Sequence, residues 1–237
     1  MPDVPNHSSF NDNGDLTMVT AIVPAYNEED YIVETLLALH STGCFDEILV
    51  VNDGSRDRTA HLARSYARLI SHPDNLGKGA AIATGMAHTN SPVVCWVDAD
   101  LGRSAVHVRD LLTPILEDEA DMTIAQFPKP RRKEGFGIVT WTAGKGIYHL
   151  TGEKIGAPLS GQRAMRKDIL SFVQRYPRGF GLEVGITVQL LRQGYRLKEV
   201  PLPLAHRSMG RNWHGFVHRG REFRDVVKTL WELYRQG

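Results

Sequence analysis

Short apolar runs alternate with helix-like stretches from residue 18 to about residue 126, and this alternation constrains the fold more than any other feature. One such stretch follows the first run and repeats apolar residues at Ile32, Leu36 and Leu39, which is the spacing of a helix face. The clearest apolar runs lie at 19–23, 46–53, 93–97 and 120–127. The pattern predicts an α/β fold with a mainly parallel central sheet and helices on both faces.

Beyond residue 126 the alternation weakens. We expect a basic, Gly/Pro-rich loop first, then helices, a strand bounded by prolines and a closing amphipathic helix. Residues 104–118 are expected to form one helix that Pro114 strains, and residues 157–170 a loop that leads into a strand or helix. The sequence shows no internal repeat and no linker that would separate two domains.

Polar residues follow the apolar runs at the points where strands would end. In a parallel sheet these ends meet at one edge, where ligands bind. Asp98 and Asp100 stand one residue apart there, and alternate residues of an extended chain share a face. Two such carboxylates repel each other unless a cation or protons neutralise them, which favours a metal site. A solvated turn after the strand is the alternative.

Composition excludes several classes of protein. The formal net charge of +1 over 237 residues gives no reason to expect nucleic-acid binding. The two cysteines, Cys44 and Cys95, have no metal-type spacing and offer no disulfide framework. No apolar stretch approaches the length of a membrane span, and residues 1–17 are expected to be a disordered leader. We therefore expect a cytoplasmic protein, with peripheral contact at the inner face of a membrane left open.

Five motifs in order carry a family resemblance: VPAYNEED, VVNDGSRDRT, NLGKGAAIATG, DAD and LSGQRAMRK. Together they resemble the family 2 glycosyltransferases of the GT-A fold, and most closely the dolichyl-phosphate mannose synthase-like branch. The stretch from GFGLEVG to HRSMGRN is also similar to the retaining glucosyl-3-phosphoglycerate synthases. The similarity spans residues 18–213, so we expect a GT-A domain there and a separate amphipathic helix over 214–237.

The resemblance implies a sugar transferase that uses a UDP- or GDP-sugar with Mg²⁺ or Mn²⁺. Asp100 should bind the metal, Asp98 should contact the metal or the ribose, and His206 should be the third ligand. A divalent cation would neutralise the pyrophosphate leaving group as a Lewis acid. Carboxylate oxygens suit Mg²⁺, and Mn²⁺ also accepts an imidazole. An isolated histidine is more commonly structural, and that alternative stays open for His206.

The resemblance also predicts where the nucleotide binds: Pro24, Ala25, Tyr26, Glu28, Asp53, Lys78 and Asp98. Tyr26 should flank the base, Glu28 should accept hydrogen bonds from the ribose, and Asp53 should hydrogen-bond the base. Lys78 lies between glycines at a predicted helix start, which is a good position for phosphate. Alternatively, Glu28 interacts with the helix dipole and Asp53 is a turn residue.

On the acceptor side, Gln162 should meet sugar hydroxyls, and Arg163, Arg207 and Arg211 should meet phosphates or an anionic acceptor. Gln162 stands where the lipid-phosphate branch more often has an aromatic residue. Glu183 is the candidate general base for a hydroxyl acceptor. A phosphate acceptor, as in polyprenyl-phosphate transferases, needs no base, and a retaining synthase assigns Glu183 no such role. A helix N-terminal carboxylate and a nucleotide-binding pseudoenzyme are the non-catalytic alternatives.

The last helix places Phe223, Val227, Leu230 and Tyr234 on one face, with basic residues beside them. Such a helix can dock on the domain, pair with a second subunit in a homodimer, or rest on an anionic membrane surface. The sequence alone leaves these three alternatives open, with docking or dimerisation the more common outcome for helices of this kind.

Overall fold

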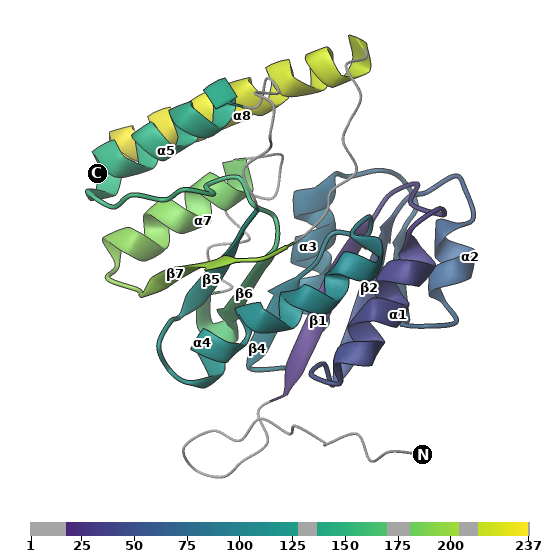
Figure 1. The fold of residues 1–237 in the computed structure, drawn as a ribbon. Helices are drawn as coiled ribbons and strands as arrows, with labels where there is room; N and C mark the ends of the chain where they lie inside the picture. The colour runs from purple at the N-terminus through teal and green to yellow at the C-terminus, as the bar shows by residue number, and fades with distance from the viewer. Residues whose placement is uncertain (1–17, 128–136, 170–180, 204–212, 237) are drawn as a thin grey trace.

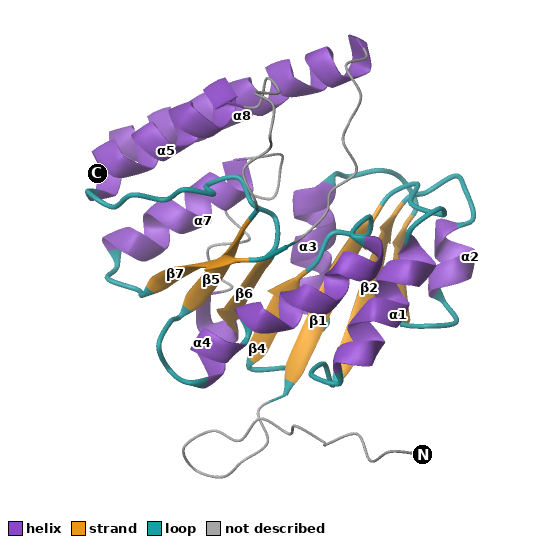
Figure 2. Cartoon of the chain, viewed as in Figure 1, coloured by secondary structure: helices purple, strands orange, loops and turns teal. Residues whose placement is uncertain are grey.

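The computed structural model describes residues 18–127, 137–169, 181–203 and 213–236. Its centre is a seven-stranded sheet in the order β3-β2-β1-β4-β6-β5-β7 (Figures 1 and 2). The strands are β1 (Val19–Ala25), β2 (Glu47–Asp53), β3 (Arg68–His72), β4 (Val93–Trp96), β5 (Met122–Gln126), β6 (Arg163–Arg166) and β7 (Leu197–Pro201). The apolar runs thus become strands, as predicted.

The sheet is mainly parallel, as expected, and β6 is the exception. β1 pairs in parallel with β2 and β4, and β2 pairs in parallel with β3. β6 lies antiparallel between β4 and β5, with Trp96 opposite Arg163. The antiparallel direction brings the segment before β6 to the carboxyl end of β4. This geometry places Gln162 beside the Asp98–Asp100 turn.

Helices cover both faces of the sheet. One face carries α1 (Ile32–Thr42), α2 (Thr59–Ala63), the 3-10 segment η1 (Gly102–Leu111) and α4 (Thr113–Leu116). A short 3-10 turn, η2 (Lys167–Ile169), follows β6. The other face packs against α3 (Lys78–Ala87) and α7 (Gly181–Arg192). The single helix expected over 104–118 is therefore wrong: Pro114 lacks an N–H donor and lies in the first turn of the separate helix α4.

A further layer lies outside α7. It consists of α5 (Gly137–Thr151) and α8 (Trp213–Gln236), whose buried residues form one apolar cluster with α7. Figure 1 shows the two helices side by side above α7 and the β5–β7 half of the sheet. The helix expected near the C-terminus is thus α8, and it packs on the domain. Within the described residues, no helix is long and apolar enough to cross a membrane.

Candidate active site at the carboxyl ends of β1, β2 and β4

Asp98 is held from two sides just beyond the end of β4. Its backbone N–H donates to Gln162 Oε1 at 2.8 Å, and its Oδ2 accepts a hydrogen bond from Gln162 Nε2. Its other oxygen, Oδ1, pairs with the ammonium group of Lys78. Because β4 ends at Trp96, Asp98 and Asp100 lie just beyond the carboxyl end of the strand, where the sequence places them.

Gln162 therefore has a different position from the one expected. Its side chain is fully buried, and both ends of its amide are engaged by Asp98. In this structure both ends of the amide hold the backbone and the carboxylate of Asp98. No local pattern predicts this pairing, because the two residues are 64 positions apart.

Lys78 is the first residue of α3 and reaches across Gly161 to Asp98. The preceding Gly77 has a φ of 94°, a conformation that side chains rarely adopt. A Cβ atom on Gly161 would lie 2.2 Å from Lys78 Nζ, so a larger residue there would displace the lysine side chain from Asp98. Burial acts to lower the pKa of Lys78, but the charges of Asp98 and Glu183 outweigh it and raise the pKa. Lys78 is therefore a permanent cation in this site.

Glu183 projects from the first turn of α7 and is only 4% exposed. Its Oε2 atom makes no hydrogen bond to any group among the described residues. Burial raises the pKa of Glu183, against the opposing effect of the nearby cations Lys78 and Arg163. A buried carboxyl group with a spare oxygen and a raised pKa is well suited to accept a proton near neutral pH.

Arg163 corrects an expectation. Its guanidinium is fully buried, and it donates to the carbonyl oxygens of Ser160 and Pro158 and to Thr187 Oγ1. Burial lowers the pKa of Arg163 to about 10, partly offset by Glu183. Since its donors are used inside the protein, it supports the segment before β6 and does not face a phosphate in this structure. An arginine in this motif suggested a residue that binds an anion, but the position of Arg163 in β6 buries the guanidinium.

Asp53 also differs from its expected role. At the end of β2 it is 2% exposed, and its carboxylate accepts hydrogen bonds from His72 Nδ1 and from the backbone N–H groups of Leu76 and Gly77. Asp53 therefore orders the loop that leads into α3, and in this arrangement its oxygens are not directed to a base. His72, which sequence analysis had not assigned a role, also contacts Thr84 Oγ1 at 2.9 Å.

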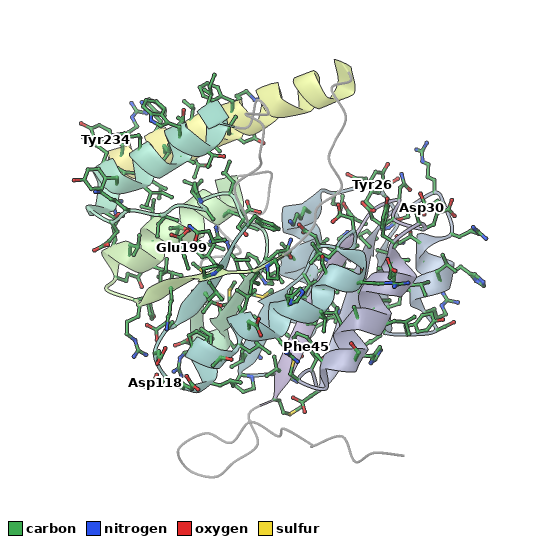
Figure 3. The ribbon with its side chains drawn as sticks, viewed as in Figure 1. Tyr26, Asp30, Phe45, Asp118, Glu199 and Tyr234 are labelled. Atoms are coloured by element: carbon green, nitrogen blue, oxygen red, sulfur yellow. The ribbon has the colours of Figure 1, made fainter. Side chains whose placement is uncertain are left out.

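The loop after β1 is tied to the loop after β2. Asn27 has a φ of 55°, and its side chain accepts a hydrogen bond from the N–H of Arg56 at 2.9 Å. The N–H of Glu28 donates to Thr59 Oγ1 at 2.7 Å. Tyr26 is 43% exposed at the rim (Figure 3). Pro24 and Ala25, the last residues of β1, lie beneath it, so this part of the expected nucleotide site is assembled around a fixed loop.

Asp100 lies two residues beyond Asp98, in a turn that α1 holds in place. Thr35 Oγ1 donates to the carbonyl of Ala99 and accepts from the N–H of Gly102, each at 2.8 Å. The part of the chain that the structure describes contains no group of three His, Cys, Asp or Glu side chains placed to hold a metal. The expected third ligand His206, together with Arg207 and Arg211, lies outside the described residues.

Glu199 is a further residue that the sequence analysis missed. Glu199 lies in β7, and its two carboxylate oxygens accept hydrogen bonds from the backbone N–H groups of Gly156 and Ala157, at 2.9 and 2.6 Å. Figure 3 shows it on the β7 side of the sheet, below the α5–α8 layer. It fixes the beginning of the segment that carries Gly161 and Gln162. A glutamate in a strand pattern gives no local signal for such a task.

The mainly parallel sheet, the acidic turn after β4 and the lysine at the start of α3 define a glycosyltransferase of the GT-A class. The chain belongs to glycosyl transferase family 2, whose family model matches residues 20–173. The match covers β1 to β6, so it includes the turn of Asp98 and Asp100 and the segment of Gln162.

Individual relatives agree with this assignment. An uncharacterized protein from Methanocaldococcus jannaschii is 31% identical over 92% of this chain and 91% of its own length. A dolichyl-phosphate beta-glucosyltransferase from Trichomonas vaginalis is 45% identical, but the match covers only 35% of this chain and 30% of that protein. The chain therefore corresponds to about a third of that relative.

Among solved structures, one of glucosyl-3-phosphoglycerate synthase from Mycobacterium tuberculosis is similar to this chain. That structure is a complex with Mn²⁺, uridine-diphosphate-glucose and phosphoglyceric acid. The TM-score is 0.75 and the sequence identity 26%, over 92% of this chain and 79% of the other.

Proposed function

We propose that this protein transfers a sugar from a nucleoside diphosphate sugar to an acceptor hydroxyl, with a divalent metal. UDP is the nucleotide that we favour, and GDP is the alternative. The observation that carries the proposal is the fixed Asp98, which Lys78 and Gln162 hold at the carboxyl end of β4 with Asp100 two residues on. The similar synthase crystallised with Mn²⁺ and UDP-glucose supports the choice of UDP.

The side chains of this turn fit a hard divalent cation. Asp98 and Asp100 offer carboxylate oxygens, which Mg²⁺ and Mn²⁺ prefer, and Asp98 already holds a cation in the form of the Lys78 ammonium. We propose Asp100 as the principal metal ligand, with Asp98 beside it and His206 as the third ligand. A bound metal would neutralise charge on the diphosphate as the sugar leaves.

Lys78 supplies a second positive charge at this point. Its ammonium lies at the start of α3, where free backbone N–H groups favour an anion. We propose that Lys78 exchanges part of its contact with Asp98 for the diphosphate when the donor binds. Asp53 holds the loop that presents Lys78, while Pro24, Ala25, Tyr26 and Glu28 form the nucleoside side of the site.

For the acceptor, we propose that Glu183 takes the proton from an attacking hydroxyl. Its burial, its raised pKa and the Oε2 atom without a hydrogen bond among the described residues support this role. The proton would move from the hydroxyl oxygen to Oε2 as the new glycosidic bond forms. Arg207 and Arg211 remain our candidates for holding an anionic group on the acceptor or donor.

Nucleotide binding is tested by thermal shift with UDP-glucose and GDP-mannose, each with and without Mn²⁺. A donor at 100 times its dissociation constant should stabilise the fold by about 2.7 kcal/mol. Asp100→Asn should remove the metal-dependent part of the shift and abolish transfer, while Asp74→Asn, an exposed aspartate of a nearby loop, should change neither. Full transfer in EDTA, or in Asp100→Asn, would overturn the proposal.

A further inference from the structure

The outer side of the α5–α8 layer exposes an unusual number of large apolar side chains. On α5, Ile138, Trp141 and Tyr148 are 70%, 64% and 46% exposed. On α8, Trp231 and Tyr234 are 55% and 63% exposed. With Phe223 and Val227, which are also exposed, these seven residues form what we call the aromatic face. They expose about 700 Å² in total if each side chain exposes on the order of 100 Å², which is more than most soluble monomers leave uncovered in one patch.

The two helices that carry the aromatic face pack against each other, so their exposed residues belong to one layer. A Cβ on Gly146 would lie 2.4 Å from Leu230, so this glycine lets α8 approach α5 closely. One turn further along, the rings of His149 and Tyr234 stack with centroids 6.4 Å apart. On α8 the exposed apolar residues recur every three or four positions, and on α5 Ile138 and Trp141 are three positions apart while Tyr148 follows seven positions later. They lie on the outer sides and flanks of the two helices, away from the buried residues that pack on α7. Figure 3 shows Tyr234 on the outer side of this layer.

Basic side chains border the aromatic face. Arg235 lies over the Trp231 ring at 4.0 Å from its centroid, and Lys154 lies 6.0 Å from the centroid of Tyr148. The exposed basic residues on or beside the face are Lys145, Lys154, Arg224, Lys228 and Arg235. Among the side chains that the structure describes in these segments, they outnumber the acidic residues, which are Glu153, Asp225 and Glu232.

The acidic residues of α8 lie away from the centre of the face. At 100° per residue, Asp225 and Glu232 fall on the flank of α8 that points away from α5. They pair with Arg224 at 3.8 Å and Lys228 at 3.9 Å, but exposed pairs of this kind are weak and leave the cations accessible. The aromatic face thus combines Trp, Tyr and Phe with an excess of positive charge.

We propose that the aromatic face docks this protein on an anionic lipid bilayer. Tryptophan and tyrosine favour the headgroup region, where their rings are in apolar surroundings and their polar atoms meet water. Lysine and arginine beside them are attracted by anionic headgroups. Charge also selects this partner over a second copy of the chain, because two such faces would bring like charges together. The proposal goes beyond the proposed transferase activity and does not depend on it.

Co-sedimentation with vesicles tests the docking. The full chain should sediment with vesicles of phosphatidylcholine and phosphatidylglycerol in equal amounts, and much less with phosphatidylcholine alone. The double variant Arg224→Glu/Lys228→Glu should lower partitioning into the anionic vesicles roughly 30-fold or more, since each basic residue contributes about fivefold near such a surface. Added salt should weaken the binding.

A second variant and a matched control separate docking from loss of fold. Trp141→Ala/Trp231→Ala should reduce vesicle binding at least tenfold without changing the melting temperature much, because both side chains are exposed. Leu37→Ser removes an equally exposed apolar side chain from α1 and should bind vesicles as the unaltered chain does. Absence of vesicle binding, binding that neither double variant weakens, or a dimer that the tryptophan variants dissociate would each overturn the proposal.

Discussion

Gln162 binds Asp98 at two points: the Gln162 amide accepts a hydrogen bond from the backbone N–H of Asp98 and donates one to the carboxylate of Asp98. A buried amide with both ends engaged fixes the direction of the carboxylate and leaves it little freedom to turn. The contact exists because β6 runs antiparallel to β4, which brings the start of one strand to the end of the other. We expect this pair to set the geometry on which donor binding depends.

Gln162→Ala should therefore impair transfer without unfolding the protein. We expect kcat/KM for the nucleotide sugar to fall about 10- to 100-fold, as is typical when a residue that orients a ligand group is lost. Steady-state kinetics at varied Mn²⁺ should show a higher metal requirement. Gln193→Ala, at an exposed position after α7, is the control and should be neutral. A Gln162→Ala enzyme with unaltered kinetics would contradict the positioning role.

Gly161→Ala should act on the same site from another side. The added Cβ would meet Lys78 Nζ at 2.2 Å, so the flexible lysine must leave Asp98 while the backbone stays in place. We expect the dissociation constant for UDP-glucose to rise about 10- to 150-fold, since a charge-assisted contact contributes about 1.5–3 kcal/mol. Isothermal titration calorimetry measures this directly. Gly137→Ala, where an added Cβ meets nothing within 4 Å, should bind the nucleotide sugar normally.

Glu183→Gln should lower turnover by roughly 10²- to 10⁴-fold if Glu183 is the base. Because burial raises its pKa, the unaltered enzyme should lose activity as the pH falls through that raised value. The variant should lose this acidic limb of the pH–rate profile. Turnover that drops only a few-fold, with an unchanged profile, would instead favour a phosphate acceptor or a retaining mechanism. Proton NMR of the anomeric linkage in the product would separate those two.

The same substitution makes a prediction about stability. A carboxyl group whose pKa is higher in the folded protein binds more protons there than in the unfolded chain. Its contribution is favourable at low pH and is lost as the pH rises from about 4.3, the ordinary value, through the raised folded value. Glu183→Gln should thus have the higher melting temperature at pH 8, and the difference should shrink toward pH 4. A difference that grows toward acid would contradict the raised pKa.

Asp53→Asn tests the loop before α3. The variant weakens the acceptor for His72 and for the N–H groups of Leu76 and Gly77, so we expect a loss of about 1–3 kcal/mol in the free energy of unfolding. Urea denaturation measures the loss. The control Asp74→Asn, in the same loop but exposed, should change stability by less than about 0.5 kcal/mol. Equal stability of the two variants would show that Asp53 does not order the loop.

The sequence predicted the fold, and it indicated the sheet edge where we place the candidate site, because both follow local rules. Apolar runs of strand length, each followed by polar residues, are sufficient to predict a parallel sheet that binds its ligand beyond the carboxyl ends of the strands. The antiparallel β6 was not predictable in the same way, since its four residues include two arginines and resemble a loop. Its direction decides which residues meet Asp98.

Individual roles were harder to predict, because they depend on burial. Arg163 and Asp53 have side chains that commonly bind anions and bases, but the sheet covers both and uses them to support loops. Glu199 and Thr35 act through contacts with segments distant in the sequence. Such pairings arise from tertiary packing, and no local pattern predicts them.

One close contact has a consequence for how the protein is made. A Cβ on Gly181, at the start of α7, would lie 2.2 Å from Thr229 Oγ1, so α8 lies directly against the turn that carries Glu183. During synthesis β1 to β6 leave the ribosome first, and α8 emerges after them. The first turn of α7 is therefore packed against its neighbour only when α8 arrives. The Lys78–Asp98 pair lies in residues that have already emerged by then, so the α7 side of the candidate site is the last part to form.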